Sequence, residues 1–216
     1  MEEVAATRLK RQINVMIVDD SSVMRGIWRR IINAQPDFSV ILNAENGKEA
    51  LSLISTKPVD VIILDVEMPE MDGLTALPLL LKAKPDVKII VASALTNQGS
   101  RTALQALTLG ASDFIEKKSA SGAFETVGRQ LVEKIRALVA KDFAEADARS
   151  ERPPLPQAKP MHLEHVPQVL AIGSSTGGPN ALVTVLKGLP RHFHSPILLV
   201  QHMPAFFITA LAERLT

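Results

Sequence analysis

Carboxylate side chains stand where two apolar runs of the sequence end. Residues 61–64 lead into Asp65, and residues 13–18 lead into Asp19 and Asp20. Such runs are typical of strands buried on both faces of a parallel sheet. Because neighbouring strands lie about 5 Å apart, the three carboxylates would converge, and they would repel one another unless a cation lay among them. Hard oxygen ligands of this kind suit Mg2+, although Asp65 by itself could equally cap the helix that follows.

A hydroxyl and an ammonium group follow two further predicted strands. Residues 87–92 lead into Ser93, and residues 112–116 lead into Lys117. In an open parallel sheet the carboxyl ends of the strands share one edge, where such sheets place their chemistry. A cation, a hydroxyl and a lysine around one aspartate favour a phosphoryl group on that aspartate, which is a known form of covalent catalysis. The sequence therefore predicts phosphorylation of Asp65.

A second set of reactive side chains lies near the end of the sequence. Residues 173–177 read G-S-S-T-G, which fits the G-x-S-x-G turn that exposes a nucleophilic serine, here Ser175. The same turn could instead bind phosphate or nothing, and it matches neither G-x-G-x-x-G nor a Walker loop. His202 follows the apolar run 196–201 and would lie beside Ser175 as its general base if the two strands are neighbours. The alternative for His202 is an ordinary core or surface histidine.

Strands and helices alternate regularly before residue 141. Strands are predicted near residues 13–18, 38–43, 61–65, 87–92 and 112–116, and helices near 22–34, 47–56, 74–84, 100–110 and 121–140. This alternation predicts an α/β domain over residues 1–140, with a parallel sheet covered by helices on both faces. Pro78 falls inside the third predicted helix and should kink it.

The composition changes after residue 140. Residues 141–167 combine charge with five prolines and show almost no apolar period, which predicts a partly extended linker. A second α/β domain is predicted over residues 168–216. Its strands are expected near 168–172 and 196–201, and its helices near 180–187 and 206–215.

Composition narrows the classes of protein to which the chain could belong. Of its 216 residues 46% are hydrophobic, which supports a buried core, yet no apolar stretch reaches the roughly 20 residues that span a bilayer. The charged first residues do not resemble a secretion signal, and the lack of cysteine excludes disulfides and thiol chemistry. A net charge of +1 and 4% aromatic residues argue against nucleic-acid binding. We therefore expect a cytoplasmic protein with no membrane insertion and no nucleic-acid partner.

Residues from about 12 to 140 resemble a two-component receiver domain. The matching positions are the acidic pair Asp19-Asp20, the phospho-acceptor Asp65, the switch hydroxyl Ser93, the switch aromatic Phe114 and Lys117. The resemblance implies a doubly wound five-stranded sheet of order 2-1-3-4-5. It also implies that Asp19, Asp20, Asp65 and the backbone carbonyl of Glu67 hold Mg2+. The family usually has a proline after the lysine, and because Lys118 stands there instead, we expect the loop to be set differently.

The motifs G-S-S-T-G-G-P and Q-H-M-P resemble the catalytic domain of the chemotaxis protein-glutamate methylesterases. In that family a receiver, a linker and this domain follow in the same order. The resemblance implies a serine hydrolase, with Ser175 as the nucleophile and His202 as the base. Its substrates would be glutamate γ-methyl esters, and also glutamines, in the cytoplasmic domains of chemoreceptors, with no cofactor for the esterase step.

The same resemblance implies how the enzyme is regulated and what this chain lacks. A chemotaxis histidine kinase would phosphorylate Asp65 and thereby relieve inhibition by the receiver. The family's third catalytic group is an aspartate in a later part of the domain. The sequence ends at Thr216, before that part, so we expect a truncated catalytic domain with little or no activity.

Two other functions remain as alternatives. The chain could be a phospho-switch module that signals through its contacts, with a remnant output domain and no catalysis. A receiver joined to a DNA-binding output ranks last, because nothing after Pro167 offers a basic recognition helix.

Overall fold

The computed structural model describes residues 12–94, 97–117, 124–151 and 168–215. The chain divides into two compact units, residues 1–135 and residues 136–216, and each is described here by itself. Lys118, whose replacement of a proline the sequence singled out, lies outside the described residues.

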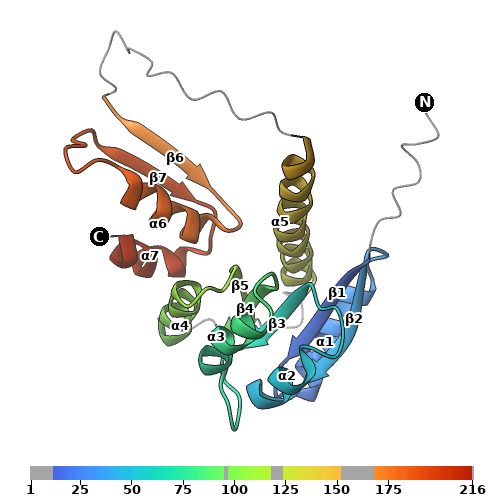
Figure 1. Ribbon diagram of the computed structural model, residues 1–216. Coiled ribbons are helices and arrows are strands. Elements are labelled where there is room, and N and C mark those ends of the chain that lie inside the picture. The colour runs from blue at the N-terminus through green and yellow to red at the C-terminus, as the bar shows by residue number, and fades with distance from the viewer. Residues whose placement is uncertain (1–11, 95–96, 118–123, 152–167, 216) are drawn as a thin grey trace. The chain divides into compact units, whose positions relative to one another are not determined.

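The first unit is built on a five-stranded parallel sheet (Figure 1). Its strands stand in the order β2-β1-β3-β4-β5, as predicted. They are β1 (Ile13–Val18), β2 (Phe38–Ala44), β3 (Val61–Asp65), β4 (Lys88–Ala94) and β5 (Asp113–Lys117). The helices between and after them are α1 (Ser22–Asn33), α2 (Gly47–Leu53), α3 (Gly73–Ala83), α4 (Asn97–Thr108) and α5 (Phe124–Glu151).

Helices cover both faces of this sheet. Gly128 of α5 lies against Ile31 of α1, so these two helices share one face, while α3 contacts both α2 and α4 on the other. Covered on both sides, the central strands are buried at nearly every position, including Val15–Val18 in β1 and the whole of β3. This explains why their sequences are continuous apolar runs and do not alternate with polar residues.

Polar side chains cap the N-termini of three helices that begin at one edge of the sheet. Ser21, Asn46 and Asp72 are the N-cap residues of α1, α2 and α3, and each side chain accepts a hydrogen bond from the backbone N–H three residues after it. Such caps satisfy N–H groups that the first helical turn leaves without partners. Ser21 comes directly after Asp19 and Asp20, and Asp72 ends the loop that follows Asp65, so these two caps help to position the site.

The linker prediction is wrong over its first part. Helix α5 does not end near residue 140 but continues to Glu151, so residues 141–151 are helical where a partly extended segment was expected. These residues are rich in alanine and in charged helix formers, which outweigh the weak apolar period. The helix ends just before Pro153 and Pro154, as the steric restriction on the residue before a proline requires.

The second unit contains a two-stranded parallel sheet (Figure 1). Strands β6 (Leu170–Ser174) and β7 (Ile197–Gln201) pair in register, with Ser174 opposite Gln201. Helix α6 (Gly178–Gly188) connects the two strands. The short 3-10 helix η1 (Ala205–Phe207) and α7 (Ile208–Leu215) follow β7. Leu198 and Val200 on β7 are 62% and 72% exposed, so this sheet has an open apolar face in the described part of the chain. No helix among the described residues is both long enough and apolar enough to cross a membrane.

Replacing Gly73 with alanine should destabilise the first unit by about 3 kcal/mol, which is a large cost for overpacking. A Cβ atom at this position would overlap the backbone carbonyl of Asp65. The Gly73 N–H also donates a hydrogen bond to the Val66 carbonyl at 2.8 Å, which holds the residue next to the end of β3. Backbone atoms in a central strand cannot move aside cheaply.

Urea unfolding measures this effect, and Gly26→Ala is the matched control. Nothing lies within 4 Å of a Cβ at Gly26 on α1, so alanine there should stabilise by about 1 kcal/mol through helix propensity alone. A Gly73→Ala protein with the urea midpoint of the wild type would refute the steric argument.

Candidate functional site

The predicted acids and the predicted lysine meet at the carboxyl edge of the five-stranded sheet. Lys117 Nζ lies 2.7 Å from Asp65 Oδ2 and 2.8 Å from Asp19 Oδ2. One carboxylate oxygen from each of Asp19, Asp20 and Asp65 lies within 4.8 Å of the other two. Asp19 and Asp65 are 1% and 5% exposed, whereas Asp20 faces solvent. The site is therefore closed on the protein side and open at Asp20.

Backbone N–H groups orient the two buried carboxylates. Asp65 Oδ1 accepts from Val66 N at 2.7 Å, and Asp19 Oδ1 accepts from Ser21 N at 3.0 Å. Each carboxylate thus uses one oxygen for the backbone and turns the other to Lys117. Burial raises the pKa of Asp65 above its ordinary value, and the Lys117 ammonium opposes that rise.

Asp65→Asn is expected to raise the thermal stability of the first unit by several degrees at neutral pH in EDTA. Because the folded-state pKa of Asp65 is raised, its ionised form at neutral pH costs stability, and a neutral amide does not. As the pH falls through the raised pKa, the wild-type carboxyl takes up its proton in the folded chain and the difference between the two proteins shrinks. Melting curves from neutral to acidic pH measure this, and a wild type that is the more stable at neutral pH would contradict it.

The ligand set fits Mg2+. Asp19 and Asp65 pair with Lys117, the donors of the three clustered side chains are all oxygens, and Asp20 leaves the cluster open to water. Glu67 lies two residues after Asp65 in the loop between β3 and α3, and its backbone carbonyl stays a predicted ligand.

The two predicted switch residues, Ser93 and Phe114, are both buried, and each contacts a residue of a neighbouring helix. Ser93 Oγ donates to the Gly99 carbonyl in α4 at 2.9 Å. Lys134 Nζ lies 5.4 Å from the centre of the Phe114 ring, and it also lies 2.8 Å from Asp113 Oδ1. A cation over the ring face attracts it, so Lys134 favours the buried position of Phe114. The hydroxyl and the ring are therefore each held by contacts with a neighbouring helix.

The second predicted pair also comes together, at the end of the two-stranded sheet. Ser175 Oγ lies 3.3 Å from His202 Nδ1, and both side chains are exposed. To accept the serine proton, Nδ1 must be the unprotonated ring nitrogen, with the ring proton on Nε2. Among the described residues no carboxylate forms a hydrogen bond or ion pair with the His202 ring. The geometry suits a nucleophile and a general base, and within the described part of the chain no carboxylate holds the imidazole.

The amide of Gln201 holds the serine turn to the histidine turn. Its Oε1 accepts from Ser174 Oγ at 2.6 Å, and its Nε2 donates to the carbonyls of Ser175 and His202 at 2.9 and 3.1 Å. The amide occupies space that a Cβ at Gly178 would fill, which explains why that position is a glycine. Gln201 thus fixes the backbone on both sides of the pair.

Sequence reasoning did not single out Gln201 or Lys134. Gln201 did stand in the motif Q-H-M-P, and a polar amide ending an apolar strand beside a glycine-rich turn was a usable signal. Lys134 lies 21 residues from Asp113, and no local pattern links the two.

The chain is similar to known proteins over nearly its whole length. Residues 15–129 match the family model of the response regulator receiver domain, and residues 170–216 match that of CheB methylesterase. The crystal structure of the response regulator domain of Thermotoga maritima CheB is similar with a TM-score of 0.54 and 43% sequence identity, covering 59% of this chain and 96% of that one.

Two relatives carry longer sequences. The protein-glutamate methylesterase/protein-glutamine glutaminase of group 2 operon from Rhodospirillum centenum is 42% identical, over 94% of this chain and 59% of its own length. The protein-glutamate methylesterase/protein-glutamine glutaminase 2 of Caulobacter vibrioides is also 42% identical, over 94% and 59%. The chain thus spans about three fifths of the length of the relatives that it matches.

Proposed function

The chain belongs to the response regulators, with a receiver domain followed by part of a CheB methylesterase domain, and from this membership we propose that it acts in chemotaxis as a phosphorylation-regulated protein-glutamate methylesterase and protein-glutamine glutaminase. The observation that carries the proposal is the Lys117 ammonium held between Asp65 and Asp19, with Asp20 beside them. This arrangement prepares one aspartate to accept a phosphoryl group.

Phosphorylation is proposed at Asp65. A carboxylate oxygen attacks the phosphorus of a phosphodonor, the bond from phosphorus to the donor's leaving group breaks, and an aspartyl phosphate forms. Asp19, Asp20, Asp65 and the Glu67 carbonyl would hold Mg2+, which neutralises charge on the phosphoryl oxygens. Lys117 would bind another of those oxygens in exchange for its contact with Asp65.

The signal is proposed to leave the site through Ser93 and Phe114. The Ser93 hydroxyl would give up its bond to the Gly99 carbonyl and donate to the new phosphoryl group, which releases the first turn of α4. Phe114 would move with that turn, and its contact with Lys134 sets the cost of moving.

The esterase step is proposed at Ser175. His202 takes the proton of Ser175 Oγ as the oxygen attacks the ester carbonyl, and returns it to the departing methanol, and water then hydrolyses the acyl-enzyme. The separation of 3.3 Å between Oγ and Nδ1 supports these roles, since it needs little change to become a good hydrogen bond. The substrates would be glutamate methyl esters and glutamines in the cytoplasmic domains of chemoreceptors, and the protein would act in the cytoplasm.

One observation favours a second candidate, a phospho-switch module without catalysis. Among the described residues no carboxylate supports His202, whereas Lys117 pairs with both Asp19 and Asp65, so the described contacts support the phosphorylation site more fully than the esterase site. A module of this kind would bind its partner in a phosphorylation-dependent manner and keep that binding in Ser175→Ala.

Phosphotransfer from a chemotaxis histidine kinase tests the proposed function. The kinase is labelled on its histidine, freed of ATP and mixed with the chain. We expect the label to pass to the chain in Mg2+, to stay on the kinase in EDTA, and to pass far more slowly from a kinase of an unrelated pathway. Label that stays on the chemotaxis kinase in Mg2+ would refute the proposed pathway.

A further inference from the structure

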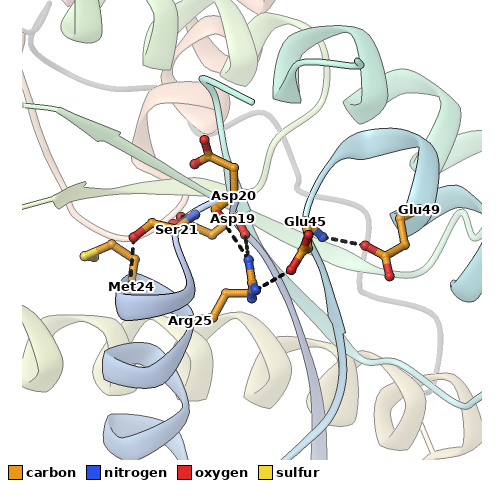
Figure 2. Close-up of polar contacts among 7 residues, drawn as sticks. All are labelled: Asp19, Asp20, Ser21, Met24, Arg25, Glu45 and Glu49. Carbon is orange, nitrogen blue, oxygen red and sulfur yellow. Dashed lines mark hydrogen bonds and ion pairs between the residues drawn. The ribbon is translucent and has the colours of Figure 1, made fainter. Parts of the chain in front are cut away.

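Arg25 links the two turns that follow the neighbouring strands β1 and β2 (Figure 2). Its Nη1 donates to the Asp19 carbonyl at 2.7 Å and to the Asp20 carbonyl at 3.0 Å. Its Nη2 lies 2.6 Å from Glu45 Oε1. One guanidinium thus binds the backbone of the acidic pair on one side and a carboxylate on the other.

The partners of Arg25 are themselves fixed. Arg25 stands in the first turn of α1, where its N–H bonds to the Ser21 carbonyl at 2.9 Å. Glu45 follows the last residue of β2, and its N–H donates to Glu49 Oε2 in the first turn of α2 at 2.7 Å (Figure 2). The side chain of Arg25 is 17% exposed and that of Glu45 is 65% exposed, so the guanidinium is the better shielded of the two. A planar fork of donors suits this task, because it fills several acceptors at fixed angles.

The contacts of Arg25 with the Asp19 and Asp20 carbonyls restrict the backbone that carries the Asp20 carboxylate. They fix the planes of the peptide groups on either side of Asp20, and those planes set the direction in which its carboxylate leaves the backbone. Asp19 has further supports in Lys117 and the Ser21 N–H, but Asp20 is the solvent-exposed member of the cluster. The carboxylate with the fewest neighbours therefore depends most on its backbone.

We propose that Arg25 is a positioning residue for divalent-cation binding by Asp19, Asp20 and Asp65. The inference rests on the proposed Mg2+ site, and it assigns to Arg25 a role through the backbone with no contact to the ion. Residues that orient metal ligands in this way commonly change metal affinity by about 10- to 100-fold when they are removed.

A purely electrostatic role predicts the opposite sign. Arg25 is a cation that binds the backbone of two of the three clustered acids, so by charge alone its removal should strengthen Mg2+ binding. A positioning role predicts weaker binding in spite of the more negative site. The direction of the change therefore separates the two roles.

Titration calorimetry with Mg2+ on the whole chain, without a phosphodonor, tests the proposal. Arg25→Gln should bind Mg2+ about tenfold more weakly than the wild type. Arg25→Lys keeps the charge and loses the fork, so it should also bind more weakly, but by less. Arg29→Gln, which removes an exposed charge one helical turn further along α1, is the matched control and should bind at least as tightly as the wild type.

The outcomes separate this inference from the proposed function. Loss of binding in Asp20→Asn is the reference: if the wild type binds no Mg2+, or Asp20→Asn binds like the wild type, the metal site and this inference both fail. If the reference holds and Arg25→Gln binds as tightly as the wild type or more tightly, only this inference fails. Thermal unfolding in EDTA checks that each variant is folded, and if Arg25→Gln is not, Arg25→Lys decides by the same comparison.

Discussion

Asp65→Asn should take up no phosphoryl group from acetyl phosphate under conditions in which the wild type gains one. Asparagine has a neutral amide in place of the nucleophilic carboxylate, and among the three clustered acids Asp65 is the one at the end of the central strand β3. Intact-mass measurement after incubation with acetyl phosphate and Mg2+ detects the modification directly. With EDTA in place of Mg2+, the wild type should not be modified either.

The companion variants make this result specific. Asp86→Asn removes an exposed carboxylate before β4 and should be modified like the wild type. Lys117→Met keeps all three acids but removes the ammonium that lies 2.7 Å from Asp65, so its modification should be strongly slowed. Equal uptake by the wild type and Asp65→Asn would show that the phosphoryl group is carried elsewhere.

A polypeptide of these 216 residues should hydrolyse methylated chemoreceptor about 10⁴-fold more slowly than a relative with a complete catalytic domain. A serine–histidine pair needs a third group to hold the imidazole tautomer and to stabilise the imidazolium, and losing that group costs about 10⁴ in rate. After Pro167 the sequence has one carboxylate side chain besides the terminus, Glu213, which lies in α7. His202 has no bond to it in the described structure.

Release of methanol from labelled receptor measures this rate. Ser175→Ala should remove what activity remains, and Thr184→Ala, which alters another hydroxyl in the second unit, should not. Turnover comparable to that of the longer relatives, if abolished by Ser175→Ala, would mean that the pair needs no acid or finds one that the described contacts do not include.

The parts of the site that could be predicted are those at the ends of buried parallel strands. Asp65, Asp19 and Lys117 each follow a buried run, and parallel pairing brings such ends together, so chain order was enough to assemble them. The same logic found Ser175 and His202, since β6 and β7 pair in register up to the residue before each.

The missed parts depend on side-chain contacts with backbone groups, whose partners the sequence does not specify. Arg25 binds backbone carbonyls, which any residue carries, and Gln201 does the same at the second site. The end of α5 was missed for a different reason: the apolar period fades after residue 140, while the helix propensity of the alanine-rich segment persists to Glu151.

Because Lys117 pairs with both Asp19 and Asp65, the order in which the strands are synthesised affects when the acidic edge can close. The ribosome releases β1, the two acids that follow it and β3 with Asp65 before it releases β5, the last strand of the sheet, which carries Lys117. Until then, pairing of β1 with β3 brings like charges together with no ammonium between them, which opposes early closure of the sheet. The last strand of the sheet therefore brings the charge that allows its acidic edge to close.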